Sequence, residues 1–193
     1  MSHRRCSPVA RSLASLALLG AAFGAGCNSG TAAPPAAPAG VAMQHLTVTS
    51  KSFASNGAIP IDYTCDGADR SPQLTWSAPP EGTRSFALVA VDPDAAGGEF
   101  VHWVAFNVRA DATSVPESVD VADLGGLAGI NGFNRTGYSG PCPPKMEPHS
   151  YAFHVYALDT VAPARSGVTA DNLRASVTGH VLAEGTLVGT FAH

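Results

Sequence analysis

Residues 137–159 read GYSGPCPPKMEPHSYAFHVYALD, a proline- and glycine-rich loop that runs directly into a strand pattern. Each proline in the loop fixes φ and removes a backbone donor, so the loop cannot join a sheet and its remaining N–H groups can face a ligand. From His149 onward, side chains of alternating character predict a strand. One face of that strand carries Tyr151, Phe153, Val155 and Ala157. We interpret the whole stretch as one wall of a preformed small-ligand pocket.

Several other segments also have strand patterns, because β-branched and aromatic residues stand between turn signals. These expected strands cover 45–49, 73–77, 84–91, 100–108 and 186–191. A short helix near the end of the chain is expected from a cap at Asp171 to about Gly179. The fold class is therefore all-β with one short helix.

Polar residues cluster where two neighbouring strands meet. Asp92 and Asp94 follow the strand at 84–91, and His102 lies near the start of the strand at 100–108. If these strands form an antiparallel hairpin, the three side chains lie at the same end of the sheet, where loops on a rigid scaffold collect function.

The N-terminus has the pattern of an export signal. Arg4, Arg5 and Arg11 precede a short apolar run, and small residues then lead to Cys27. This pattern predicts a signal peptide over 1–27 with a lipobox-like Cys27 as the lipidation site, although cleavage to a soluble periplasmic form is the alternative. Residues 28–44 are rich in proline and alanine and predict a tether, so the folded domain is expected over 45–193. The expected location is the bacterial envelope, with membrane contact only through the N-terminal lipid.

The charge balance excludes one class of partner. Without residues 1–27 the chain has 8 basic and 15 acidic side chains, and no stretch rich in lysine and arginine. Nucleic acid is therefore not an expected partner.

The cysteine count predicts one disulfide. Cys6 belongs to the signal and Cys27 is the expected anchor, which leaves Cys65 and Cys142 in an oxidising compartment. We expect these two to pair.

Several motifs together resemble the phosphatidylethanolamine-binding proteins, in particular their bacterial branch, the Raf-kinase-inhibitor-like proteins. The resemblance covers about residues 45–193. The matching residues are Tyr63–Gly67, Ser71 and Pro72 with Leu74 and Trp76, Asp92–Asp94, His102 and Trp103 with Asn107, Tyr138–Pro144, His149 with Tyr151, and Leu187–Thr190.

This resemblance implies a β-sandwich of two antiparallel sheets with a small pocket for phosphate-like anions or phospholipid headgroups. The ligand-binding residues that it implies are Asp92, Asp94, Phe100, His102, Gly140, Cys142, Pro143, Pro144, His149 and Tyr151. The chain departs from the family pattern at Ala96, Met146 and Ser150. Ser150 replaces an arginine and leaves open how the central loop is anchored, and Met146 would add apolar surface at the pocket mouth.

We expect His102, His149 and Tyr151 to donate to an anionic ligand, and Asp92 either to accept from a histidine and raise its pKa or to stay protonated. The expected ligand is a small phosphate-like or carboxylate anion or a phospholipid headgroup. No cofactor and no catalytic constellation is predicted. Two alternatives stay open: an inhibitor of an envelope or external protease or kinase, and, less favoured, a metal enzyme with a two-histidine, one-carboxylate site.

Overall fold

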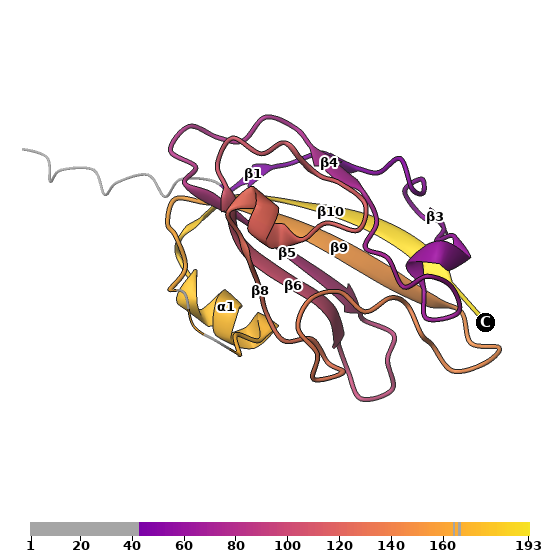
Figure 1. Cartoon of the computed structure of the whole chain (residues 1–193). Coiled ribbons are helices and arrows are strands. Elements are labelled where there is room, and N and C mark those ends of the chain that lie inside the picture. The colour runs from indigo at the N-terminus through magenta and orange to yellow at the C-terminus, as the bar shows by residue number, and fades with distance from the viewer. Residues whose placement is uncertain (1–42, 164, 166) are drawn as a thin grey trace, which may run out of the picture. The chain divides into compact units, whose positions relative to one another are not determined.

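The computed structural model describes residues 43–163, 165 and 167–193 (Figure 1). The expected signal peptide, Cys27 and nearly all of the expected tether lie outside these residues. Among the residues described, no helix is long and apolar enough to cross a membrane.

Two β-sheets and one short α-helix make up the domain. The sequence order of the elements is β1 (Gln44–His45), β2 (Val48–Thr49), β3 (Gly57–Ala58), η1 (Ile61–Tyr63), β4 (Leu74–Trp76), β5 (Ser85–Asp92), β6 (Phe100–Arg109), β7 (Ser114–Val115), η2 (Val121–Leu124), β8 (Leu127–Ala128), β9 (His149–Leu158), α1 (Ala170–Ser176) and β10 (Val181–Phe191). The prediction of a mainly β fold with one short helix and two sheets is confirmed.

The larger sheet has the order β1-β10-β9-β5-β6-β8, with β3 also paired to β10, and the smaller sheet has the order β2-β4-β7. The long strands β5, β6, β9 and β10 pair with one another in antiparallel orientation. The short strands β1 and β3, however, both run parallel to β10. The expectation of purely antiparallel sheets is therefore wrong at this edge. Two short segments that precede the core strands, β1 and β3, each pair with β10 in parallel.

Two apolar layers flank the larger sheet. On one face, Phe86, Phe153 and Val155 pack against Leu74 and Trp76 of the smaller sheet. The opposite face of the same sheet packs against α1 and the segment before it (Figure 1). The alternation in 149–158 is confirmed: Tyr151, Phe153, Val155 and Ala157 are all buried between the sheets.

Several element boundaries differ from expectation for physical reasons. The expected strand at 45–49 is two strands in different sheets, because Leu46 N–H donates to the Glu184 carbonyl while Ser77 N–H donates to the Thr47 carbonyl, so the chain crosses between the sheets here. The helix cap is Thr169, whose side chain accepts from Asn172 N–H, rather than Asp171.

Two other expectations need correction. The last strand starts at Val181, five residues before the expected 186. Residues 109–130, where no regular pattern was found, contain β7, η2 and β8. Both differences arise because pairing with a neighbouring strand, which a local pattern does not encode, decides these elements.

Gly185 on β10 marks a close approach between the sheets. A Cβ at this position would lie 2.2 Å from the Leu46 carbonyl oxygen and 2.7 Å from a Val48 methyl. Because the first of these atoms is backbone, the neighbour cannot move aside at low cost.

We therefore expect Gly185→Ala to lower the free energy of unfolding by about 1–3 kcal/mol through overpacking. Gly97→Ala is the matched control, since nothing lies within 4 Å of a Cβ at Gly97, and its effect should stay within about 0.5 kcal/mol. Urea unfolding of the full chain measures both values. Equal stability of the two variants would contradict the close approach at Gly185.

Candidate functional site

The register of the large sheet brings three strand ends together. β5 pairs with β6 on one side and β9 on the other, both antiparallel, and Asp92 is the register partner of Phe100. Because β9 starts where β5 ends, His149 comes to the same edge. The predicted convergence of Asp92, Asp94 and His102 at one end of the sheet is confirmed, and His149 joins them.

A cavity of about 220 Å³ opens at this edge. It is smaller than sites for drug-sized ligands, which start near 300 Å³. Its lining consists of Asp92, Asp94, Ala95, Ala96, Phe100, His102, Phe133, Cys142, Pro143, Pro144, Glu147 and His149. Eight of the ten predicted ligand-binding residues thus lie around one cavity.

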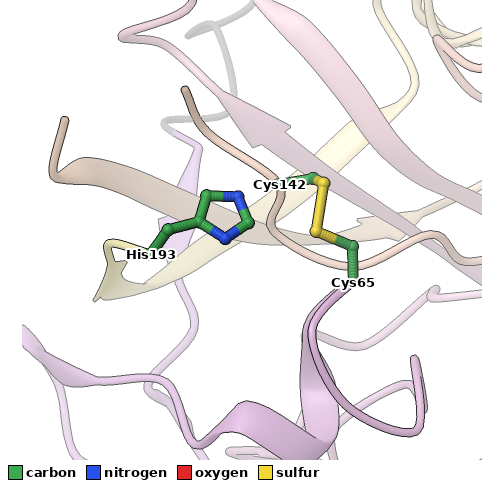
Figure 2. A group of neighbouring side chains, drawn as sticks. All are labelled: Cys65, Cys142 and His193. Carbon is green, nitrogen blue, oxygen red and sulfur yellow. A yellow bond between two sulfur atoms is a disulfide. The ribbon is translucent and has the colours of Figure 1, made fainter. Parts of the chain in front are cut away.

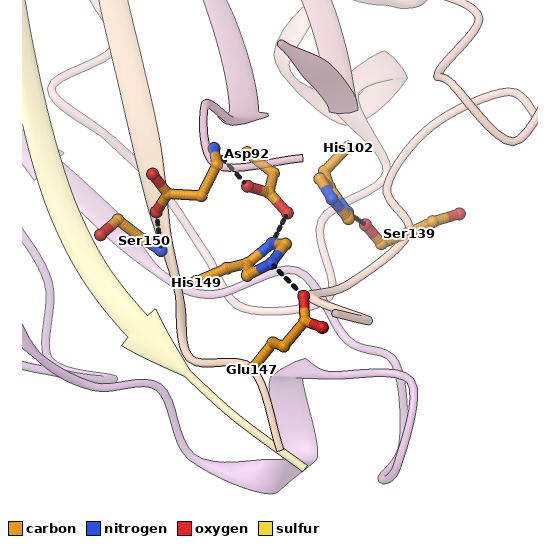
Figure 3. A network of polar contacts seen from close by, with 7 residues as sticks. Asp92, His102, Ser139, Glu147, His149 and Ser150 are labelled. Atoms are coloured by element: carbon orange, nitrogen blue, oxygen red, sulfur yellow. Dashed lines mark hydrogen bonds and ion pairs between the residues drawn. The ribbon is translucent and has the colours of Figure 1, made fainter. Parts of the chain in front are cut away.

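Asp92 organises the polar part of the cavity (Figure 3). Its Oδ2 lies 2.7 Å from His149 Nδ1, and its Oδ1 accepts from Asp94 N–H at 2.8 Å. The carboxylate is almost completely buried. The hydrogen bond that His149 donates to Asp92 raises the pKa of His149 above its ordinary value, against the opposing effect of burial. The expected contact between Asp92 and a histidine is thus present, and the histidine is His149.

The pKa of His102 is shifted in the opposite direction to that of His149. Its Nδ1 lies 2.8 Å from the Ser139 backbone carbonyl (Figure 3). Since a carbonyl only accepts, Nδ1 carries the proton, which leaves Nε2 as the nitrogen available to a ligand. Burial lowers the pKa of His102, and the Ser139 carbonyl only partly offsets this. Near neutral pH, Nε2 is therefore an acceptor rather than the donor that the sequence suggested.

Tyr151 does not line the cavity. Its side chain is 1% exposed, and its ring stands edge-on to His102 with 5.3 Å between ring centres. Among the described residues, its hydroxyl has no hydrogen-bond partner. Burial, together with the nearby Asp92 carboxylate, raises the pKa of Tyr151, so the hydroxyl stays protonated. Tyr151 lies on the same face of β9 as His149, and its predicted role as a donor stays a prediction.

Gly140 is the second predicted residue outside the cavity lining. Its N–H donates to Asp69 Oδ1 at 2.6 Å and is thus already used. A Cβ at this position would lie 2.4 Å from the Tyr63 carbonyl oxygen, so only glycine fits. Gly140 therefore joins the central loop to the loop that carries Cys65.

The central loop is anchored without the arginine that Ser150 replaces. The predicted disulfide between Cys65 and Cys142 is present, with 5.5 Å between the Cα atoms. Cys65 N–H also donates to the Pro141 carbonyl at 3.1 Å, and Ser150 N–H donates to Asp94 Oδ2 at 2.7 Å. These contacts answer the question that the sequence left open.

Four lining residues were not predicted as ligand-binding: Ala95, Ala96, Phe133 and Glu147. Phe133 stacks edge-on against Phe100 at 4.7 Å and against His102 at 5.7 Å. It stands in a loop held by Asn131, whose Oδ1 accepts from Phe133 N–H. Glu147 belongs to the stretch 137–159 that was interpreted as a pocket wall, whereas Phe133 belongs to no periodic segment and the sequence carried no signal for it. Met146, expected at the mouth, is 90% exposed and lies outside the lining.

The two histidines and Asp92 do not converge as metal ligands would. We considered groups of three or more His, Cys, Asp or Glu residues whose possible ligand atoms all lie within 4.8 Å of one another. In the part of the chain that the structure describes, one such group exists, and it consists of Cys65, Cys142 and His193.

A larger hollow of about 470 Å³ lies beside α1. Its lining includes Arg165 and Asn172 but brings no titratable pair together. Charge and hydrogen-bonding groups converge at the smaller cavity, which is therefore the candidate site.

A β-sandwich with a small, rigid, mixed polar and aromatic pocket at one sheet edge defines a ligand-binding protein. The sequence profile of the phosphatidylethanolamine-binding proteins matches residues 49–192. The chain belongs to this family.

Known relatives agree with this assignment. A UPF0098 protein of Methanothermobacter thermautotrophicus is 40% identical over 149 residues, which are 76% of this chain and 98% of the relative. A UPF0098 protein of Aquifex aeolicus is 38% identical over 150 residues, 76% of this chain and 88% of the relative. The crystal structure of YbcL from E. coli, described as a member of the mammalian PEBP family, superposes with a TM-score of 0.72 at 32% identity and covers 77% of this chain and 99% of YbcL.

The Asp92–His149 pair leads to a testable prediction about the pKa of His149. We expect Asp92→Asn to lower the pKa of His149, because it removes the charge and the hydrogen bond that raise it. NMR titration of the His149 ring measures this pKa. Glu147→Gln is the control: Glu147 Oε2 lies 3.9 Å from His149 Nε2 and contributes less to the shift, so its effect should be smaller. An equal or larger shift in Glu147→Gln would contradict the role assigned to Asp92.

Proposed function

We propose that the cavity binds a small phosphate-bearing headgroup, with the phosphate at His149 and His102. The observation that carries this proposal is the 2.7 Å contact between His149 Nδ1 and Asp92 Oδ2. It fixes the ring so that Nε2 is the remaining nitrogen, and it favours the protonated form in which Nε2–H donates to an anion.

The second histidine, His102, would accept a hydrogen bond from the ligand, whereas His149 would donate one. Neutral His102 offers a lone pair on Nε2, which accepts from a phosphate O–H or from a ligand N–H. Its side chain is 3% exposed and packs against Phe100 and Phe133, so it is held in one orientation. The pocket thus presents one donor and one acceptor from imidazoles.

The charges of the lining favour a zwitterion over a simple anion. The groups of the lining that can become positive are the two histidines, whereas Asp92, Asp94 and Glu147 are acidic. These carboxylates would repel a phosphate dianion, and the two histidines would offset that repulsion only in part. A headgroup with an ammonium group satisfies both signs, since the ammonium can lie near Asp94 and Glu147 or against the face of an aromatic ring.

The size and stiffness of the cavity fit a headgroup. About 220 Å³ does not hold two acyl chains, so a lipid would leave its chains outside. Proline, a disulfide and backbone hydrogen bonds fix the wall before any ligand arrives, which reduces the ordering cost of binding.

The proposed binding has a defined pH dependence. The pKa of His149 is raised in the folded protein, so affinity should be fully present at pH values below the folded pKa and should fall as pH rises through it. Phosphoethanolamine should bind more tightly than inorganic phosphate or ethanolamine alone. Isothermal titration calorimetry at pH 6 and pH 8 measures both effects.

Variants complete this test. His149→Ala should weaken phosphoethanolamine binding about ten- to a hundredfold, the value of one charge-assisted hydrogen bond. His180→Ala is the control, because His180 is also paired with a carboxylate, Asp159, at 2.7 Å but lies outside the cavity. If His149→Ala and His180→Ala bind phosphoethanolamine equally well, or if affinity rises from pH 6 to pH 8, the proposal is wrong.

We further propose that the chain is exported and attached to the membrane through Cys27. The basic residues, apolar run and small residues before Cys27 support this. The disulfide of the domain suits an oxidising compartment.

Fractionation of expressing cells tests the attachment. The wild-type chain should sediment with membranes, and Cys27→Ser should move to the soluble fraction, because the lipid provides the anchor. Cys6→Ser should fractionate like the wild type. Cofractionation of Cys27→Ser with membranes would contradict the anchor.

A further inference from the structure

We propose that the junction between Cys65, Cys142 and His193 becomes a Zn²⁺ site when the disulfide is reduced, with both thiolates and His193 Nε2 as ligands. This site is separate from the imidazoles of the pocket and does not depend on the proposed headgroup binding. It does include Cys142, which lines the pocket wall.

The first observation is the closeness of three residues of the types that hold zinc. One ligand atom from each of Cys65, Cys142 and His193 lies within 4.8 Å of the other two (Figure 2). Figure 2 shows the imidazole edge turned toward the two sulfurs. Sulfur and imidazole nitrogen are the preferred ligands of Zn²⁺, which accepts two thiolates and one histidine with a fourth position open.

The second observation is the orientation of the histidine. His193 Nδ1 lies 2.7 Å from Asp66 Oδ2. Because a carboxylate only accepts, Nδ1 carries the proton and Nε2 presents a lone pair. Metal-bound histidines commonly have such a carboxylate behind them, which fixes the tautomer and increases the basicity of the ligand nitrogen. An edge contact with Phe191, with 5.7 Å between ring centres, further positions the ring.

The third observation is that the two cysteines are held near each other without the disulfide. Cys65 N–H donates to the Pro141 carbonyl at 3.1 Å, and Gly140 N–H donates to Asp69 Oδ1 at 2.6 Å. Tyr138 Oη donates to the Tyr63 carbonyl at 2.7 Å. Breaking the S–S bond therefore leaves the loops joined by three hydrogen bonds, and both thiols stay in place.

The conversion balances with a dithiol reductant. The reductant gives two electrons and two protons, the S–S bond breaks, two thiols form, and the reductant becomes a disulfide. Each thiol then loses its proton as its sulfur binds Zn²⁺. With Zn–S bonds of about 2.3 Å the two sulfurs must lie roughly 3.8 Å apart, which side-chain rotation can supply because both cysteines are exposed.

The test uses the full chain with Cys6→Ser and Cys27→Ser, so that Cys65 and Cys142 are the remaining cysteines. The protein is reduced with a phosphine, which does not compete for metal through thiols, and titrated with Co²⁺ as a spectroscopic probe and with Zn²⁺ against a chromophoric chelator. We expect one metal ion per reduced chain, thiolate-to-cobalt charge-transfer absorption, and no such absorption in the oxidised chain.

Single variants test which residues contribute to Zn²⁺ binding. His193→Ala should lower Zn²⁺ affinity at least about tenfold, and Asp66→Asn should lower it by about tenfold through the orientation of His193. His180→Ala, a histidine–carboxylate pair at the other end of β10, should have no effect.

Four outcomes would overturn the proposal. The first is the absence of the charge-transfer band in the reduced chain. The second is equal affinity in wild type and His193→Ala, and the third is loss of the folded circular dichroism spectrum on reduction that Zn²⁺ does not restore. Binding that persists when Cys65 and Cys142 are both replaced by serine would place the metal elsewhere and also overturn it.

Discussion

The antiparallel pairing of β5 with both β6 and β9 is the constraint on which the site depends. Asp92 ends β5, Phe100 begins β6 opposite it, and His149 begins β9 on the other side. Three strands with this register must present their ends at one edge. The β5 strand is buried along its whole length, so the hydrophobic effect that fixes its register also fixes the geometry of the pocket. The position of the polar side chains is therefore a consequence of core packing.

The loops contribute the part of the site that the sheet cannot. The loop of residues 137–148 meets the loop that contains Cys65 through a disulfide and backbone hydrogen bonds, and Gly140 allows the close approach. This junction aligns the Ser139 carbonyl with His102. A change at the junction would thus act on the tautomer of His102 as well as on the cavity wall, although the junction lies outside the sheet.

Regular sequence patterns predicted the strands and turns that depend on neighbouring residues in the chain. The elements and contacts that depend on pairing between distant segments could not be predicted in this way. The strand of 149–158 and the positions of Asp92, His102 and His149 could be predicted, because alternation and turn residues report burial and chain reversal directly. Phe133 could not, since a polar loop carries no periodicity and its place depends on Asn131. Tyr151 was assigned to the pocket by resemblance, and the structure buries its side chain against His102, on the β9 face that also carries His149. The parallel pairing of β1 and β3 with β10 likewise has no local signal.

The two pocket histidines show how one side chain type acquires two roles. His149 is paired with a carboxylate, which favours its charged form, and His102 is paired with a carbonyl in a buried position, which favours its neutral form. Of the two imidazoles, His149 is thus the one whose charged form is favoured. A phosphate dianion without an ammonium group would meet the Asp92 carboxylate with only His149 available as a cation. This charge balance supports the proposed headgroup over free phosphate, because an ammonium group on the ligand would offset the acidic residues of the lining.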